Sequence, residues 1–99
     1  MIRHIVMWKL ATDDPAQKAA QIETLRDRFA ALVGVIEGTR SLDIVADVDR
    51  TDGNWDVALI GDYDDHQALD AYQVHPAHQD VVSYVRSVVS ARACIDFEL

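Results

Sequence analysis

The sequence predicts an α+β fold in which four strands form one antiparallel sheet. Three observations support this prediction. Apolar side chains recur at strand spacing in four stretches and at helical spacing between them. Asp-Pro, Gly and a second Pro stand where these stretches meet, as expected of turns and helix ends. The length of 99 residues suits a single domain over residues 1–99 with one modest core.

Residues 2–10 predict the first strand, because large side chains alternate between two faces. One face carries Ile2, His4, Val6, Trp8 and Leu10, and the other carries Arg3, Ile5, Met7 and Lys9. Since both faces contain large apolar residues, we expect a strand that is covered on both sides.

An amphipathic helix is predicted next. Asp14 suits the N-cap, Pro15 the first helical position, and Gln17 the partner position of a capping box. Gly34 or Gly38 can end this helix. Its apolar face consists of Ile22, Leu25, Phe29, Leu32 and Val33.

Two strands and a loop follow. Residues 39–48 predict an edge strand, because Leu42, Ile44, Ala46 and Val48 share one face while acidic residues occupy the other. Asp52-Gly53 is a turn-forming pair. Residues 55–63 predict a third strand whose apolar run, 57–60, indicates burial on both faces.

The last third of the chain predicts a helix in two parts and a closing strand. Asp64 is the expected cap of a short helix, with Gln67 as its partner and an inner side of Ala68, Leu69 and Tyr72. Pro76 opens the second part, whose apolar stripe is Val81, Val82, Val85, Val88 and Val89. Residues 91–99 alternate like an edge strand. The order β-α-β-β-α-β is the ferredoxin-like arrangement, with the first and third strands central.

Helices in this topology cover one face of the sheet only. Four strands of ordinary length leave about 350 Å² of the other face open, which is large for a monomer. We therefore expect a homodimer, two copies packed face to face with a small space enclosed between them. A monomer whose open face binds another molecule is the alternative.

Composition excludes several classes of function. A formal charge of −8 disfavours nucleic acid and anionic membranes as partners, and no apolar run approaches the ~18 residues of a membrane span. Cys94 is the only cysteine, so no disulfide forms within the chain. The first residues lack the regions of a signal peptide. We expect a cytoplasmic protein.

The stretch 72–78, Tyr-Gln-Val-His-Pro-Ala-His, is the first candidate site. Pro76 makes His75 the N-cap of the following helix and places His78 in its first turn, where the helix dipole disfavours a charged imidazole. A neutral His78 is suited to act as a general base. Tyr72 could donate a hydrogen bond to a developing oxyanion.

His4 shares a strand face with Val6 and Trp8, and we expect all three to line the enclosed space. Structural roles are the alternative: a capping His75, a core Tyr72, and a His4 bonded to a backbone carbonyl. His66 is interpreted as a solvated residue.

A metal site made by His75 and His78, with His4 and Asp56, is a weaker alternative because no further His or Cys cluster accompanies them. The sequence also lacks a calcium loop, a Gly-rich phosphate loop and a G-x-S-x-G motif. We therefore expect no metal and no other cofactor.

Residues 3–10 (RHIVMWKL) and 71–79 (AYQVHPAHQ) together resemble the stress-responsive A/B barrel (Dabb) family, and 95–98 (IDFE) fits its closing strand. The resemblance covers essentially the whole chain, and the Tyr-x-x-His-Pro-x-His motif is its most specific part. It implies a homodimeric α/β barrel, in agreement with the open sheet face.

The family does not imply one activity. Its members include plant stress proteins and a plant polyketide cyclase that works without a metal, whose base, hydroxyl partner and first-strand histidine match His78, Tyr72 and His4. This chain has Phe29 and Asp56 where that enzyme has a tyrosine and a histidine. Phe29 cannot donate a hydrogen bond, and Asp56 would bring negative charge near an enolate.

The first hypothesis is thus a Dabb-family homodimer with a small apolar ligand cavity. The ligand would be a small aromatic or polyketide-like molecule, and His4, Val6, Trp8, Phe29, Asp56 and His75 are the expected contacts. The second is a cofactor-independent lyase or cyclase with His78 as base and Tyr72 as donor. The third is a purely structural dimeric scaffold.

Overall fold

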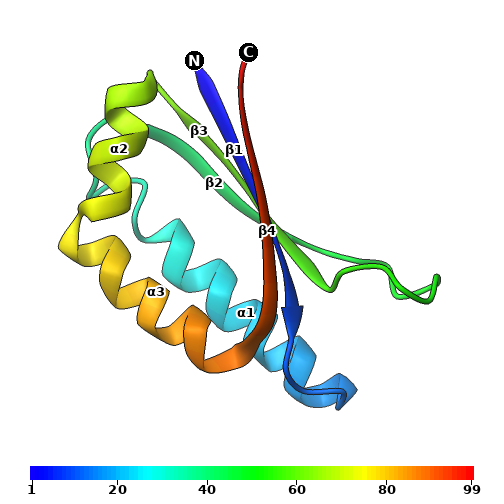
Figure 1. Cartoon of the computed structure of the whole chain (residues 1–99). Helices are drawn as coiled ribbons and strands as arrows, with labels where there is room; N and C mark the ends of the chain where they lie inside the picture. The colour runs from blue at the N-terminus through cyan, green and yellow to red at the C-terminus, as the bar shows by residue number, and fades with distance from the viewer.

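The structure, a computed structural model, describes residues 1–99. Seven elements follow one another along the chain (Figure 1): β1 (Ile2–Leu10), α1 (Pro15–Ala30), β2 (Thr39–Ala46), β3 (Val57–Tyr63), α2 (His66–Val74), α3 (Pro76–Val88) and β4 (Val89–Glu98). No helix has the length and apolar character needed to cross a membrane.

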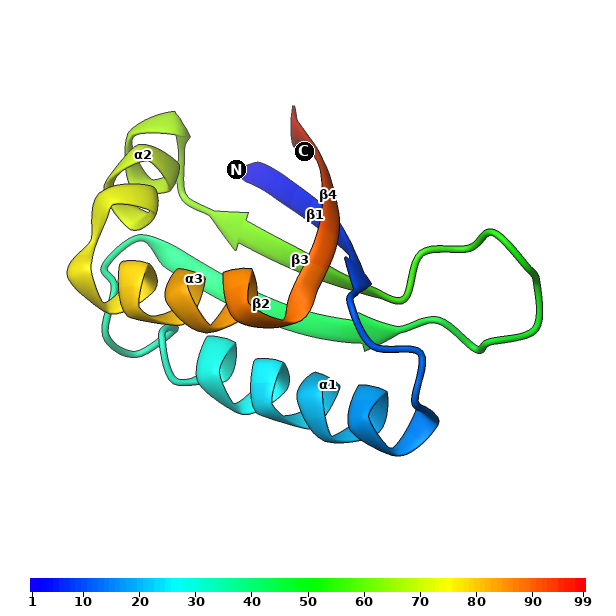
Figure 2. The same cartoon turned by 60° about the horizontal axis from the view of Figure 1, so that its bottom comes forward.

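The strands form one antiparallel sheet in the order β2-β3-β1-β4. This confirms the ferredoxin-like prediction, with β1 and β3 central and β2 and β4 at the edges. Figures 1 and 2 show α1 and α3 on the same side of the sheet, which we call the helix face. The opposite side is the open face. The two termini meet at one end of the sheet, where the Leu99 amide donates to the Met1 carbonyl at 3.0 Å.

One hydrophobic core lies between the helix face and the helices. Along β1 and β3 every second side chain enters it, which is the alternation expected of a strand with one covered face. The prediction that both faces of these strands are buried is wrong for the single chain. On the open face Met7 is 40% exposed and Ile60 is half-buried. The continuous apolar runs of β1 and β3 therefore place apolar side chains on the open face as well, and the chain itself does not cover that face.

Local hydrogen bonds decide where the helices begin. Asp14 caps α1 as predicted and accepts from the Gln17 amide at 2.8 Å. The Gln17 side chain does not complete a capping box, because it accepts from the Thr12 hydroxyl at 2.6 Å instead. The expected cap of α2, Asp64, is wrong by one residue. Asp65 accepts from the Ala68 amide at 2.8 Å, while Asp64 pairs with the edge-strand residue Arg40.

Strand pairing ends earlier than predicted beside the β2–β3 loop. The last cross-strand bond runs from the Asp47 amide to the Asp56 carbonyl at 3.0 Å, and the loop between them projects beyond the sheet (Figures 1 and 2). Val48 is therefore 77% exposed rather than part of a strand face, and Trp55 precedes β3. At the other edge, β4 begins at Val89 and not at residue 91.

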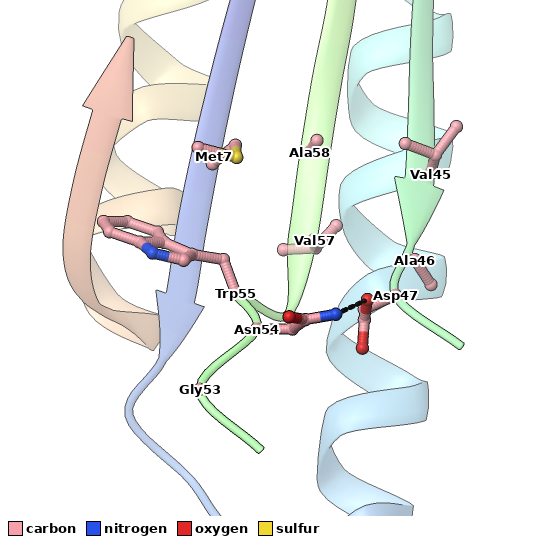
Figure 3. Close-up of a pocket in the computed structure, with 9 residues that line it drawn as sticks. All are labelled: Met7, Val45, Ala46, Asp47, Gly53, Asn54, Trp55, Val57 and Ala58. Carbon is pink, nitrogen blue, oxygen red and sulfur yellow. Dashed lines mark hydrogen bonds between the residues drawn. The ribbon is translucent and has the colours of Figure 1, made fainter. Parts of the chain in front are cut away.

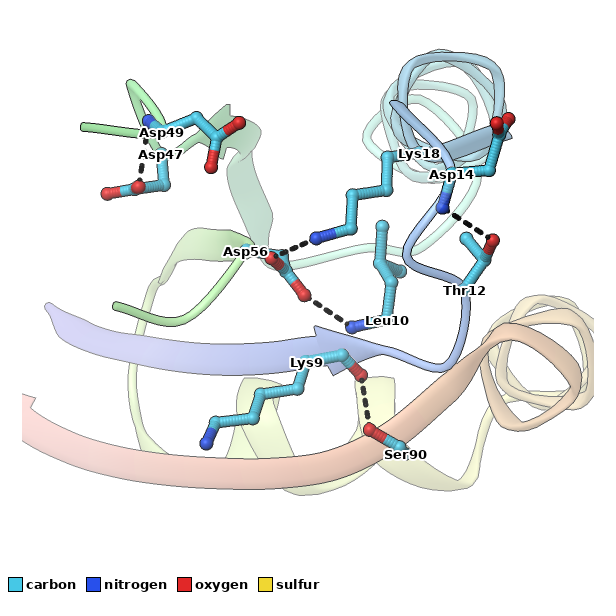
Figure 4. Close-up of polar contacts among 9 residues, drawn as sticks. All are labelled: Lys9, Leu10, Thr12, Asp14, Lys18, Asp47, Asp49, Asp56 and Ser90. Carbon is cyan, nitrogen blue, oxygen red and sulfur yellow. Dashed lines mark hydrogen bonds and ion pairs between the residues drawn. The ribbon is translucent and has the colours of Figure 1, made fainter. Parts of the chain in front are cut away.

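Asp56 ties the end of β1 to the start of α1. One carboxylate oxygen accepts from the Leu10 amide at 2.8 Å, and the other accepts from the Lys18 ammonium at 2.9 Å (Figure 4). Burial by itself raises the pKa of Asp56, but the Lys18 ammonium and the Leu10 N–H outweigh burial and hold this pKa below its ordinary value.

We expect the substitution Asp56→Asn to lower the free energy of unfolding by about 1–2 kcal/mol at pH 7, because it removes a charge-assisted pair from a half-buried place. The depressed pKa means that the contribution of Asp56 is complete above the ordinary value of 3.8 and is lost as the pH falls through the lower native pKa. Urea denaturation at pH 7 and pH 3 measures both effects.

Asp52→Asn is the matched control, because it removes the same charge from an exposed loop position. An Asp56→Asn protein with the stability and pH response of Asp52→Asn would contradict the structural role of Asp56.

Candidate functional site

The break between α2 and α3 positions the histidines of the candidate site. Proline disfavours helical backbone in the residue before it, and His75 has extended angles of φ −65° and ψ 134°. Its Nδ1 accepts from the Ala77 amide at 3.1 Å, so His75 is the N-cap of α3 as predicted. One ring nitrogen of His75 is therefore engaged in capping α3.

The same break leaves the Gln73 carbonyl near the end of α2 available to side chains. His78 Nδ1 lies 3.2 Å from this oxygen and Gln79 Nε2 donates to it at 2.6 Å. Because a carbonyl oxygen accepts only, Nδ1 carries the proton and the lone pair of the neutral ring is on Nε2.

Burial is the main cause that lowers the pKa of His78, and the Gln73 bond opposes it. The charge of the nearby Arg92 guanidinium lowers this pKa further. The ring is thus held neutral, as the sequence predicts, but burial rather than the helix dipole is the largest cause.

Tyr72 lies behind His78 and is fully buried, with 0% of its surface exposed. Its ring centroid is 4.2 Å from that of His78 and 4.9 Å from that of Tyr63. Neither tyrosine hydroxyl has a hydrogen-bond partner. Burial raises the pKa of Tyr72 to about 12, and the Tyr63 hydroxyl, although outside hydrogen-bond geometry, lowers it. Gly61 leaves room for Tyr63, since a Cβ there would stand 2.7 Å from the Tyr63 hydroxyl.

His4 faces the helices from β1 and is 4% exposed. Its Nδ1 is in close contact with the carboxylate of Asp96, which pairs with His4 in the β1–β4 register. The carboxylate orients the imidazole and leaves Nε2 for other contacts. Sequence reasoning missed Asp96, which lies two residues before the end of the edge strand β4 and opposite His4 on β1.

The expected location of His4, Val6 and Trp8 is wrong. We expected them in a space between two copies, but they point into the space between the sheet and the helices of one copy. Alternation divides a strand into two faces without saying which one the helices cover. The row with His4 lies beneath the helices, and the row with Met7 lies on the open face.

A cavity of about 370 Å³ lies between β1, β4 and α3. Its walls combine aromatic and aliphatic side chains with two histidines, two glutamines and two arginines: His4, Val6, Trp8, Phe29, Leu59, Gln73, His78, Gln79, Val82, Val85, Arg86, Val89 and Arg92. Trp8 and Phe29 are stacked, with ring centroids 5.9 Å apart. We expected a small, mostly apolar cavity, and the observed wall is more polar than that because 6 of its 13 residues are not hydrophobic.

Five of the predicted residues line this cavity, namely His4, Val6, Trp8, Phe29 and His78. The structure does not bring Tyr72, His75 or Asp56 to its walls. Of the wall residues that sequence reasoning missed, Val82, Val85, Arg86 and Val89 recur from His78 at spacings of three and four residues, a helical signal. Arg92 pairs with Trp8 across β1 and β4, a relationship visible only in the sheet register.

Two other hollows lie elsewhere on the molecule. One, of about 450 Å³, is on the open face beside Met7, Val45 and Trp55, where Asn54 bonds to Asp47 (Figure 3). The other, of about 430 Å³, lies between α1 and the β2–β3 loop and includes Asp56, whose charge is already paired with Lys18. Neither contains a histidine, so the cavity beneath α3 is the candidate site.

One group of side chains has donor types suited to a metal ion. Ligand atoms of His4, Cys94 and Asp96 all lie within 4.8 Å of one another, and zinc takes nitrogen, sulfur and oxygen donors. A metal would compete with Asp96 for His4 Nδ1. The combination considered from the sequence is not brought together, because His75 caps α3 and Asp56 is bound to Lys18 and Leu10.

Comparison with known proteins identifies similar chains. Residues 2–99 match the family described as Stress Responsive A/B Barrel Domain (Dabb). An uncharacterized protein of Streptomyces coelicolor, SCO4036, is 34% identical over 86 residues, which are 87% of this chain and 88% of that one.

Solved structures show the same fold. A dimeric protein of unknown function and ferredoxin-like fold from Bacteroides fragilis is 26% identical, with a TM-score of 0.86 over 99% of this chain and 95% of that one. A dimeric ferredoxin-like protein of unknown function from Thermobifida fusca is also 26% identical, with a TM-score of 0.81 over 99% and 90% of the two chains.

We predict that His78 titrates below its ordinary pKa of 6.5 and that its neutral ring carries the proton on Nδ1. Nitrogen-15 NMR of the imidazoles measures both. Since the folded pKa is depressed, the contribution of His78 to stability is complete above 6.5 and decreases as the pH falls toward the native pKa. His78→Gln should therefore reduce the loss of stability between pH 7 and pH 5.

His66→Gln is the control, because the His66 side chain is 73% exposed. A His78 ring that titrates at or above 6.5, or that carries its neutral proton on Nε2, would refute this description of the site.

Proposed function

The chain belongs to the stress responsive A/B barrel domain (Dabb) family, and from that premise we propose that it is a homodimer that binds a small aromatic or polyketide-like molecule. The binding site is the cavity beneath α3 in each copy. The single cysteine supports a reducing compartment, and we propose the cytoplasm.

The observation that carries this proposal is the composition of the cavity wall. A volume of about 370 Å³ is within the range of small-molecule sites. Trp8 and Phe29 supply a flat apolar surface deep in the cavity, and both are at most 4% exposed. His4 and His78 each direct a ring from the wall, with Nδ1 of each already bound by another group. Such a wall favours a ring system with a few polar substituents.

Apolar residues on the open face support the homodimer. Ile95, Ile5 and Ile60 are in register across three strands, and the next row contains Ala93, Met7, Ala58 and Val45. Figure 3 shows Met7, Ala58 and Val45 side by side on adjacent strands. Ile95 is 61% exposed and Phe97 is 41% exposed. A second copy packed on this face would remove these side chains from water.

A second candidate function is general-base chemistry of the lyase or cyclase type. The observation that favours it is His78, a neutral imidazole whose Nε2 is free in the wall of a cavity. Tyr72 could supply a hydrogen bond only after His78 moves, because the tyrosine is fully buried behind the ring. Its unpaired hydroxyl is nevertheless available for such a contact.

The cavity proposal is tested by filling the cavity. We expect Val82→Phe to weaken the binding of a neutral probe such as 2-naphthol at least tenfold, because the larger ring occupies the space between α3 and Trp8. Quenching of Trp8 fluorescence measures binding in a Trp55→Phe background, where Trp8 is the only tryptophan.

Val48→Phe is the control, because Val48 is exposed on the loop. If the parent protein binds no probe of a naphthalene panel, or if Val82→Phe binds as the control does, the cavity is not a ligand site and the scaffold hypothesis replaces it.

The dimer is tested at Ile95. We expect Ile95→Lys to weaken self-association at least about 30-fold, equivalent to about 2 kcal/mol, because an ammonium group from each copy would be buried in the interface. Analytical ultracentrifugation over a concentration series measures the change. Val74→Lys places the same charge on an exposed valine at the end of α2 and should leave association unchanged. A parent protein that sediments as a monomer would overturn the proposal.

A further inference from the structure

We propose that the ligand of the cavity beneath α3 is an aromatic carboxylate, whose negative group binds to Arg86 and Arg92. This inference rests on the proposed function and names the chemical class that the site selects. It follows from two positive charges at the edge of the cavity that the protein itself does not neutralise.

The two arginines reach the cavity from different elements. Arg86 lies one turn beyond Val82 on α3, and both residues are part of the wall. Arg92 lies on β4 opposite Trp8, at the start of the polar row that includes Cys94 and Asp96. Both arginines are exposed at the surface, while Trp8 is buried. The cavity therefore has an aromatic interior and a cationic entrance.

Neither arginine has an ionic partner. The chain forms six ion pairs, and none of them includes Arg86 or Arg92. Lys9, Arg28 and Arg50 are also outside these ion pairs, but none of the three lines the cavity. Arg86 and Arg92 are therefore the two unpaired cations that lie in the wall of one cavity.

The nearest ionisable groups do not neutralise Arg92. Asp96, on the same face of β4, is in close contact with His4. Burial and Asp96 raise the pKa of the Cys94 thiol while Arg92 lowers it, and the net effect leaves this thiol uncharged near neutral pH. The charge of Arg92 also helps to lower the pKa of His78. The entrance to the cavity is thus positive although the protein as a whole carries a charge of −8.

An aromatic acid with one negative charge matches both the aromatic interior and the cationic entrance of the cavity. Its ring would lie against Trp8 and Phe29, and its carboxylate would accept from the guanidinium groups, whose planar donors fit two carboxylate oxygens. A carboxylate carries one negative charge, which limits repulsion from an acidic protein compared with a dianionic phosphate. The carboxylate is also too polar for the inner wall, so it fixes the orientation of the ring.

The test compares an acid with its neutral isostere. In the Trp55→Phe background, Trp8 fluorescence measures the affinity for 2-naphthoate and for 2-naphthamide at pH 7. We expect the protein to prefer the acid at least tenfold, and we expect Arg86→Gln and Arg92→Gln each to weaken binding of the acid about fivefold to tenfold while leaving the amide unchanged. Rising salt concentration should reduce the affinity for the acid only.

Arg40→Gln is the matched control, because it removes the same charge from an exposed residue that is paired with Asp64 outside the cavity. Equal affinities for acid and amide, unaffected by Arg86→Gln and Arg92→Gln, would overturn this inference and leave the cavity as a site for neutral aromatics. If neither compound quenches Trp8, the proposed function itself fails, and the inference fails with it.

Discussion

The proline at position 76 is the constraint on which the site depends. It keeps His75 out of helical backbone, so α2 ends, α3 begins at a new angle, and the Gln73 carbonyl loses its place in a continuous helix. Two side chains of α3 then bond to that carbonyl, and one of them is His78. The bond decides which ring nitrogen carries the proton. The backbone restriction that Pro76 places on His75 therefore decides which nitrogen of His78 carries the proton.

The buried hydroxyls of Tyr63 and Tyr72 are a second consequence of the same packing. Buried polar atoms without partners are rare and costly. Here the Tyr72 ring packs on His78, the Tyr63 ring packs on Tyr72, and the Tyr63 hydroxyl lies over Gly61. The Tyr72 ring packs against both Tyr63 and His78. His78, bonded to the Gln73 carbonyl, His4, held by Asp96, and two arginines without ion pairs converge on one cavity. These polar groups line a cavity between the sheet and α3, and this arrangement supports a ligand site.

The sheet has two faces with separate tasks. Its helix face forms the core and the cavity, while its open face carries exposed apolar rows that suit a second copy. The edge strand β4 illustrates the division. Its alternate residues Arg92, Cys94 and Asp96 point toward the helix side, and Ala93, Ile95 and Phe97 point the other way. Polar residues of this strand thus lie beside the cavity while its apolar residues lie on the outside. In a strand that covers the core of a monomer, the apolar residues would face inward and the polar residues outward. The opposite arrangement in β4 is consistent with the dimeric state in which similar proteins are described.

The sequence by itself determined the order of the elements, the central and edge positions of the strands, and the Asp14 and His75 caps. These features depend on spacing and on neighbours within a few residues, which the sequence contains directly. Tertiary structure decided the rest. Two adjacent aspartates, Asp64 and Asp65, are equivalent as caps until the pairing of Asp64 with Arg40 separates them. The alternation of side chains along β1 places His4 and Met7 on opposite faces of the strand. Only the position of the helices decides which of the two faces is buried. Arg86 and Arg92 are ordinary surface arginines in the sequence. Their unpaired charge becomes visible only when α3 and β4 bring them to one cavity, because pairing depends on contacts between residues far apart in the chain.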